Sequence, residues 1–213
     1  MWSWRELIQR AGPPEHLVQL YGNDDQLLIE NVILYLLEGL TRGDGLLVIG
    51  TPSHREAIIR HMSQENVGTA AAIGAGRLVL LDAAETLDRF MVNGEPDWPL
   101  FEQVVRGVCE TLGARAGVRG VRAFGEMVGL LWTNGQHSAA IRLEEYWNRL
   151  LQDHAICLYC AYPIDPLGGG FEPTKLQALL EVHTHLLAGP RTMLSSVGPA
   201  PRLRTASAIL PAS

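Results

Sequence analysis

The sequence lacks the features that mark several classes of protein. No stretch contains the roughly 18 uninterrupted apolar residues of a membrane span, and the first residues, MWSWRELIQR, lack the apolar core of a secretory signal. Cysteine is scarce, with 3 in 213 residues, and this odd number suits a reducing compartment better than a disulfide framework. We therefore expect a cytoplasmic protein that does not contact a membrane.

Positive charge is also in short supply. The 17 Lys and Arg residues are outnumbered by 23 Asp and Glu residues, which gives a net charge of −6 and a pI near 5.6. A nucleic-acid surface requires a local excess of basic residues, so direct binding of nucleic acid is not expected. The rest of the composition, with 47% hydrophobic and 19% charged residues, predicts a globular domain with a substantial core.

The stretch from His16 to Thr51 predicts a strand, a long helix and a second strand. Residues 27–40 are apolar at almost every position, so this helix must be covered nearly all round. Residues 46–49 form an unbroken apolar run, which is typical of a parallel sheet with both faces buried. Further strands are expected at 77–81, 121–124 and 155–162, and further helices at 53–65, 83–91, 99–116, 127–132, 136–153 and 173–187. This alternation predicts a three-layer α/β fold, in which helices cover both faces of a largely parallel sheet of about five or more strands.

The chain divides into three expected segments. Residues 1–14 form a short lead-in that ends at Gly12-Pro13-Pro14, and residues 15–187 form one domain. Residues 188–213 are rich in Pro, Ser and Ala and contain no acidic residue. Such a composition offers little apolar surface to bury, so we expect this tail to be disordered.

The turn between the first strand and the long helix lacks the chemistry of a phosphate loop. A P-loop has the pattern G-x-x-x-x-G-K-[ST] at this place. Counting from Gly22, the glycine, lysine and hydroxyl positions hold Leu-Leu-Ile at 27–29. Asp24 and Asp25 stand in the turn itself, where a carboxylate caps a helix well but repels a triphosphate. The turn therefore predicts no nucleotide or other cofactor, and it argues against an enzyme.

Several segments in a fixed order carry a family resemblance. They are HLVQLYGNDD, GLLVIGTPSHREAI, LVLLDAAETLDRFMVNGEPD, RAFGEMVGLLW and RLEEYWN, within residues 16–187. Together they resemble the MEDS domain, the methanogen/methylotroph DcmR-type sensory domain of prokaryotic signalling proteins. The resemblance implies a non-catalytic, RecA-like relative of the RecA and KaiC ATPases, without a functional P-loop, that senses small organic compounds. No kinase or helix-turn-helix motif follows, so it also implies a separate kinase or transcription regulator as partner, and self-association stays open.

In open α/β sheets, ligands bind outside the carboxyl ends of the strands. The residues expected at those ends are Tyr21, Asp25, Thr51, His54, Asp82, Glu126, Trp132 and Tyr162. Aromatic rings, carboxylates and one imidazole, without any lysine, suit a small neutral, cationic or partly apolar molecule better than a phosphate. Glu126 is the leading candidate because it follows an apolar strand, although it could instead stabilise the turn after Phe124.

Glu144 and His16 are expected to serve the structure. Glu144 falls within the apolar face of the helix at 136–153, whereas Glu145 falls outside it. A buried acid needs a partner, and Arg122 or another arginine is the expected one. His16 begins the first strand, where a lone histidine is more often structural than a ligand.

A metal site is not expected. Cys157 and Cys160 are three apart on a strand and point to opposite faces, so they cannot share an ion without a bulge. His183 and His185 are two apart on the last predicted helix and do not share a face either.

Three functions remain open. The first is a sensory domain that binds a small organic molecule and signals through a partner. The second is an ATPase or phosphotransferase with an unorthodox phosphate site, in which Glu126 activates water. The third is an interaction module whose pocket is filled by Tyr21, Trp132 and Tyr162. An open cleft beside Glu126 favours the first function over the third.

Overall fold

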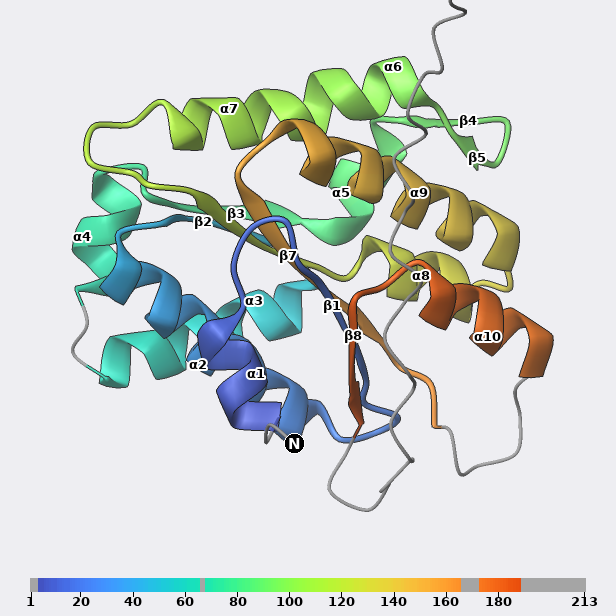
Figure 1. Ribbon diagram of the computed structural model, residues 1–213, viewed down its shortest axis with the longest axis horizontal. Helices are drawn as coiled ribbons and strands as arrows, with labels where there is room; N and C mark the ends of the chain where they lie inside the picture. The colour runs from blue at the N-terminus through green and yellow to red at the C-terminus, as the bar shows by residue number, and fades with distance from the viewer. Residues whose placement is uncertain (1–3, 66–67, 166–172, 189–213) are drawn as a thin grey trace, which may run out of the picture.

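The computed structural model describes residues 4–65, 68–165 and 173–188. A six-stranded sheet with the order β3-β2-β6-β7-β1-β8 runs through them, and every pairing in it is parallel (Figure 1). Its strands are β1 (His16–Leu20), β2 (Gly45–Gly50), β3 (Leu78–Asp82), β6 (Val121–Gly125), β7 (Ile156–Tyr162) and β8 (His185–Ala188). A small antiparallel hairpin contains β4 (Met91–Val92) and β5 (Glu95–Pro96).

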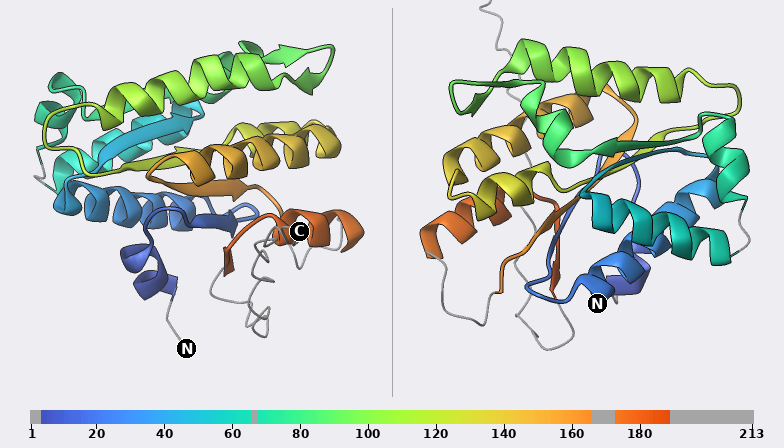
Figure 2. Two further views of the ribbon diagram at one scale, coloured as in Figure 1. Left: turned by 45° about the horizontal axis from the view of Figure 1, so that its top comes forward. Right: turned by 180° about the vertical axis from the view of Figure 1, so that it is seen from behind.

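Helices cover both faces of the sheet, which confirms the three-layer α/β fold (Figure 2). One face carries α1 (Trp4–Arg10), α2 (Asp25–Arg42), α3 (Pro52–Gln64) and α4 (Thr69–Gly74). The other face carries α5 (Ala83–Asp88), α6 (Trp98–Phe101), the π-helical segment η1 (Glu102–Arg106), α7 (Gly107–Gly113), α8 (Met127–Thr133), α9 (His137–Asp153) and α10 (Pro173–Glu181). We call these the α2 face and the α9 face. Among the described helices, none is both long enough and apolar enough to cross a lipid bilayer.

The unbroken apolar strands are explained by burial on both faces. Every residue of β2 and β7 is buried. Along β2, Leu46 and Val48 pack beneath the α2 face, and Leu47 and Ile49 pack beneath the α9 face. Burying each such side chain contributes about 1.5–3 kcal/mol, so an apolar residue at every position stabilises the sheet from both sides.

The end of the domain differs from the sequence-based prediction. The helix expected at 173–187 ends at Glu181, and the chain then forms β8 parallel to β1. The hydroxyl of Thr184 accepts the N–H of His16 at 2.8 Å and donates to its carbonyl at 2.7 Å, which fixes the new strand beside β1. A short apolar run does not by itself distinguish helix from strand. Ala188 therefore belongs to the sheet, and residues 189–213 of the expected tail lie outside the described residues.

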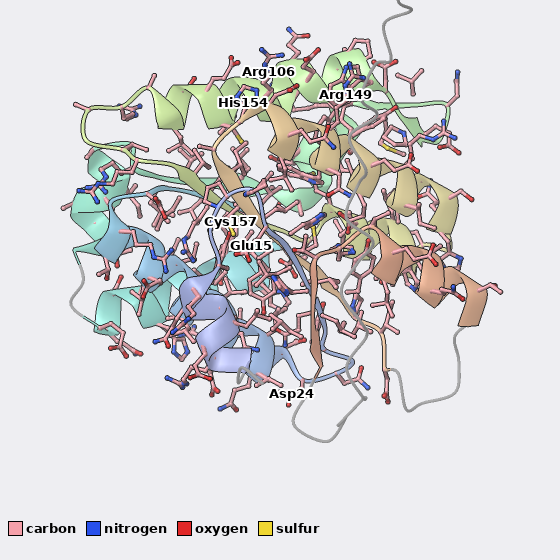
Figure 3. All side chains as sticks on the ribbon, in the orientation of Figure 1. Glu15, Asp24, Arg106, Arg149, His154 and Cys157 are labelled. Carbon is pink, nitrogen blue, oxygen red and sulfur yellow. The ribbon has the colours of Figure 1, made fainter. Side chains whose placement is uncertain are left out.

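The carboxyl ends of the strands meet at one edge of the sheet because all strands are parallel. Figure 3 labels one residue at each edge of the sheet: His154, just before β7, at the amino edge, and Asp24, just after β1, at the carboxyl edge. Gly22 adopts a φ of +58° in the turn after β1, and Asp24 then caps α2 by accepting the N–H of Leu27 at 3.0 Å. Capping by Asp24 confirms one of the predicted roles of the two turn carboxylates.

Candidate functional site

The carboxylate of Glu126 is held by the turn that follows β2. Glu126 is 4% exposed, and its Oε2 accepts the N–H of Thr51 at 2.9 Å. Its Oε1 lies 2.5 Å from Nδ1 of His54, in the first turn of α3. The side chain makes no capping bond to its own helix α8, so its contacts join the end of β6 to the start of α3.

Glycine at the end of β2 makes this arrangement possible. A Cβ atom on Gly50 would lie 3.0 Å from Oε2 of Glu126 and 3.2 Å from Cγ of Arg55. Both distances are tighter than ordinary contacts, so a larger residue at position 50 displaces the carboxylate or the arginine.

The imidazole of His54 lies between two carboxylates. Its Nε2 is 3.7 Å from Oδ2 of Asp25, the first residue of α2. The hydrogen bond to Glu126 raises the pKa of His54 although burial opposes it, and the charge of Asp25 acts in the same direction as Glu126. The Tyr21 ring meets the imidazole edge-on, with centroids 6.3 Å apart. Burial, followed by the charges of Glu126 and Asp25, raises the pKa of Tyr21 and keeps its phenol neutral.

A cleft of about 530 Å³ opens beside His54, between the N-terminal half of α2 and residues 53–61 of α3. Asp25 and His54 contribute to its wall, and Ile29 and Ala57 provide apolar surface. The volume falls within the range of small-molecule sites. Five of the predicted residues thus meet at one place, of which two line the cleft and three lie behind them: Tyr21, Asp25, Thr51, His54 and Glu126.

Asp82 lies on the same edge but is engaged by structural contacts. It caps α5 by accepting the N–H groups of Ala84 and Glu85 at 2.9 and 3.0 Å. Nη2 of Arg55 donates to its second oxygen at 2.7 Å. The Glu85 N–H contributes most to lowering the pKa of Asp82, although burial opposes it. Asp82 is therefore connected to the His54 helix through Arg55, the residue that follows His54.

The structure does not bring Trp132 and Tyr162 together with His54. Their rings pack edge to face, 5.6 Å apart, in the core beneath the α9 face. Tyr21 packs beneath the α2 face instead. The three aromatic residues therefore do not fill one pocket together.

Tyr162 belongs to a second polar group centred on Glu144. Its hydroxyl donates to Oε1 of Glu144 at 2.7 Å, and Glu144 is completely buried, as its position on the apolar face of α9 predicts. Nε2 of His16 lies 3.3 Å from Oε2, and Nε2 of His183 lies 3.1 Å from Oε1. Burial opposes ionisation of Glu144, but His183 and His16 outweigh it and lower its pKa.

The prediction that an arginine pairs with Glu144 was wrong. Nε of Arg122 donates to Oδ2 of Asp44 at 3.1 Å, and its other nitrogens donate to the carbonyls of Ala11 and Tyr35. All of these contacts lie away from Glu144. Histidines, rather than an arginine, compensate the buried acid.

Cys160 completes this second group. Its Sγ lies 3.3 Å from both Oε2 of Glu144 and Nε2 of His16. Burial and the charge of Glu144 raise the pKa of the thiol. Cys157 packs beneath the opposite face, which confirms that the two cysteines are separated by the sheet. We call His16, Glu144, Cys160 and His183 the buried quartet; one ligand atom from each lies within 4.8 Å of the others.

The residues around His54 and those around Glu144 both lie within one recognised domain. The sequence model of the family described as MEthanogen/methylotroph, DcmR Sensory domain (MEDS) matches residues 15–184. The chain belongs to the MEDS family. A sensory role in general follows from this membership. No curated protein matches the sequence. The matched range of the MEDS domain includes every predicted site residue and all of the buried quartet.

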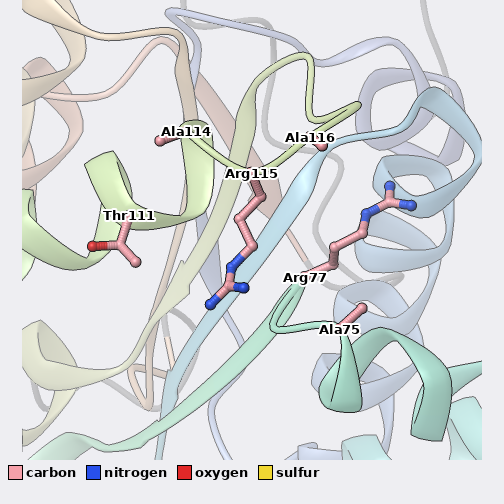
Figure 4. A pocket seen from close by; sticks show the side chains of 6 residues that line it. All are labelled: Ala75, Arg77, Thr111, Ala114, Arg115 and Ala116. Carbon is pink, nitrogen blue, oxygen red and sulfur yellow. The ribbon is translucent and has the colours of Figure 1, made fainter.

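A second cleft of this MEDS domain, of about 630 Å³, lies at the amino end of β3 (Figure 4). Arg77 and Arg115 line it together with small side chains. It is at the opposite edge of the sheet from Glu126 and shares no residue with the predicted site. The cleft beside His54 is therefore the one that the sequence-based prediction and the fold both indicate.

The buried quartet of the MEDS domain is not visible in pairs of residues that are close in the sequence, because its members come from four separate parts of the chain. Cys157 and Cys160 are on opposite faces, as predicted. His183 and His185 lie beyond the end of α10 rather than on it, and His183 contacts Glu144 while His185 contacts Glu15. The quartet instead combines one member of each pair with residues from β1 and α9. The one signal in the sequence is the position of Glu144 within the apolar face of its helix. A buried acid requires partners, but local spacing does not reveal which residues they are.

Proposed function

We propose that this MEDS domain is a non-catalytic cytoplasmic sensor that binds a small organic molecule in the cleft beside His54. The signal then passes to a separate kinase or transcription regulator. The observation that carries the proposal is the contact of Asp25 and His54, in the wall of an open cleft at the carboxyl edge of the sheet, with Glu126 behind them. Membership of a sensory family supports the general role.

The lining of the cleft suits a ligand with hydrogen-bond donors, or with groups of both charges, on a partly apolar body. Asp25 and Glu30 present carboxylates, Arg60 presents a guanidinium group, and Ile29 and Ala57 present apolar surface. The Asp25 side chain is 68% exposed, whereas that of Glu126 is 5% exposed. Asp25 can therefore turn towards a ligand, while Glu126 holds the imidazole of His54 in a fixed orientation.

The position of His54 supports a route from ligand to partner. The side chain connects the start of α3 with Asp25 on α2 and with Glu126 at the end of β6. A ligand that replaces the contact between His54 and Asp25 changes the link between α2 and α3. These two helices cover the α2 face, so such a change reaches a surface on which a partner can bind.

A thermal-shift screen of small organic metabolites tests the proposal. A ligand at about 100 times its Kd stabilises the folded state by about 2.7 kcal/mol. We expect a positive compound to lose its shift with Asp25→Asn and His54→Gln. Glu145→Gln, which changes an exposed carboxylate on α9, serves as the control and should keep the shift. Equal shifts in all three variants would place the ligand elsewhere.

A further inference from the structure

The buried quartet joins four separate parts of the chain. His16 is the first residue of β1, Glu144 lies on α9, Cys160 lies on β7, and His183 precedes β8. Their exposed fractions are 1%, 0%, 0% and 6%. No feature of the proposed sensory cleft explains why two histidines, an acid and a thiol meet in the core.

The spacing of the quartet matches the coordination shell of a metal ion. Nε2 of His16, Oε2 of Glu144 and Sγ of Cys160 are each 3.3 Å apart. Around a tetrahedral zinc ion with bonds of about 2.0–2.3 Å, the ligand atoms lie about 3.3–3.8 Å apart. Nε2 of His183 approaches the same carboxylate at 3.1 Å. With all four atoms within 4.8 Å, the widest pair needs to close by only about 1 Å to reach that geometry.

The outer nitrogens of both histidines are fixed by carbonyl groups. Nδ1 of His183 lies 2.7 Å from the carbonyl oxygen of Leu179, which can only accept a hydrogen bond. Nδ1 of His16 lies 2.8 Å from Oδ1 of Asn148, whose amide nitrogen donates to the carbonyl of Val182. Both Nδ1 atoms therefore donate outwards, and the Nε2 atoms that face the centre of the quartet are the positions at which an ion can take the place of a proton. Histidines that bind metals are oriented by such contacts of their outer nitrogen.

At the centre of the quartet, the thiol of Cys160 donates to Glu144, but His183 does not. Although Nε2 of His183 lies 3.1 Å from Oε1 of Glu144, it makes no hydrogen bond within the described part of the chain, because the geometry is unsuitable. An unprotonated imidazole nitrogen facing a buried carboxylate is unfavourable, and a metal ion bound between the two groups removes this conflict. A carboxylate and a thiolate together carry two negative charges, which one divalent ion neutralises.

We propose that the buried quartet binds one Zn²⁺ ion in a closed, structural site. Its ligands are Nε2 of His16, Nε2 of His183, Sγ of Cys160 and an oxygen of Glu144. Two imidazoles and a thiolate suit zinc, whereas Mg²⁺ and Ca²⁺ prefer oxygen ligands throughout. Binding releases the proton of the thiol to solvent. Four protein ligands leave no position for a substrate, so the ion ties β8 and the turn before it to the rest of the domain.

Metal content and cobalt substitution test the site on the full chain, prepared without a histidine tag. We expect about one zinc ion per chain from cells supplied with zinc. Cobalt in its place should give the visible bands of tetrahedral coordination and a thiolate-to-cobalt charge-transfer band. Cys160→Ser should lose the charge-transfer band, and Cys157→Ser should keep it. Cys157 is the matched control because it is equally buried, at 0% exposed, on the same strand.

Two further variants separate metal binding from folding. His183→Gln should release zinc, whereas His185→Gln, two residues further on, should retain it. Asn148→Ala leaves all four ligands in place and should weaken zinc binding by about 10–100-fold, because it removes the carbonyl that orients His16. A chelator should lower the melting temperature of the unmodified protein, and added zinc should restore it.

Two results would overturn the proposal. One is a zinc-supplied protein that contains no metal, gives no cobalt spectrum and melts at the same temperature with a chelator; the quartet is then an ion-paired network. The other is full zinc occupancy with an unchanged cobalt spectrum in Cys160→Ser, which places the ion elsewhere. If Cys160→Ser fails to fold, the Asn148→Ala affinity and the chelator experiment decide the question.

Discussion

The imidazole of His54 lies 2.5 Å from the buried carboxylate of Glu126, a residue 72 positions further along the chain. The pair joins the loops that follow β2 and β6, two neighbouring strands of the sheet. The other ring nitrogen of His54, Nε2, faces Asp25 at the cleft. One nitrogen of His54 therefore contributes to the fold, and the other is accessible to a ligand in the cleft.

The first prediction concerns the dependence of stability on pH. The folded-state pKa of His54 is raised, so its protonated form stabilises the fold. This contribution is complete below the unfolded pKa of about 6.5 and is lost as the pH rises through the higher folded pKa. His54→Gln should therefore lower the free energy of unfolding by about 1–3 kcal/mol near pH 6, and by less at alkaline pH. Urea denaturation across this range measures the difference. A constant difference would show that titration of His54 does not contribute.

A second prediction is that His54 and Glu126 are energetically coupled. Glu126→Gln keeps the size of the side chain but removes the charge that faces the imidazole, so it should also destabilise the fold. In the double variant with His54→Gln, the loss of unfolding free energy should be smaller than the sum of the two single losses by about 0.5–3 kcal/mol. Glu110→Gln is the control, since this exposed carboxylate on α7 pairs with Arg106. Its effect should add to that of His54→Gln, and additivity in both cycles would refute a direct interaction.

The third prediction concerns Gly50, whose lack of a side chain leaves room for Glu126. Gly50→Ala places a Cβ 3.0 Å from the carboxylate and should cost about 1–3 kcal/mol of stability. Gly125 ends the adjacent strand β6, and a Cβ there meets no atom within 4 Å. Gly125→Ala should therefore be close to neutral. Melting temperatures of the two variants provide the comparison, and similar values would mean that the loop after β2 adjusts freely.

Much of the fold was predictable because the governing signals are local. Unbroken apolar runs such as 46–49 require burial on both faces, and parallel sheets provide it. The strand β8 was missed because His185–Ala188 is short and apolar, and its pairing with β1 comes from residues far away in the sequence. The proposed ancestry among the RecA-like ATPases stays a prediction.

The candidate site was predictable only in part. Topology places the residues after β1, β2 and β6 at one edge, which brought His54 and Glu126 together as candidates. Topology alone does not say which face a strand-end side chain occupies, and Tyr162 faces the α9 side with Cys160. The buried quartet depends on contacts such as that between His16 and Cys160, 144 residues apart, which no local pattern reveals.

The last prediction is that ATP and GTP with magnesium do not bind at the turn after β1. Phosphate binding at a helix start requires free N–H groups and a favourable charge. Asp24 already accepts the N–H of Leu27, and the carboxylate of Asp25 stands exposed beside it. A triphosphate would have to displace the first acid and approach the second. Isothermal titration with either nucleotide should show no heat of binding at micromolar protein.

The control variant Asp24→Asn keeps the cap and removes one charge. It should not bind either nucleotide, because Leu-Leu-Ile at 27–29 still lacks the lysine and the hydroxyl. A micromolar complex that is lost when the turn is altered would contradict this prediction and favour the phosphotransfer function.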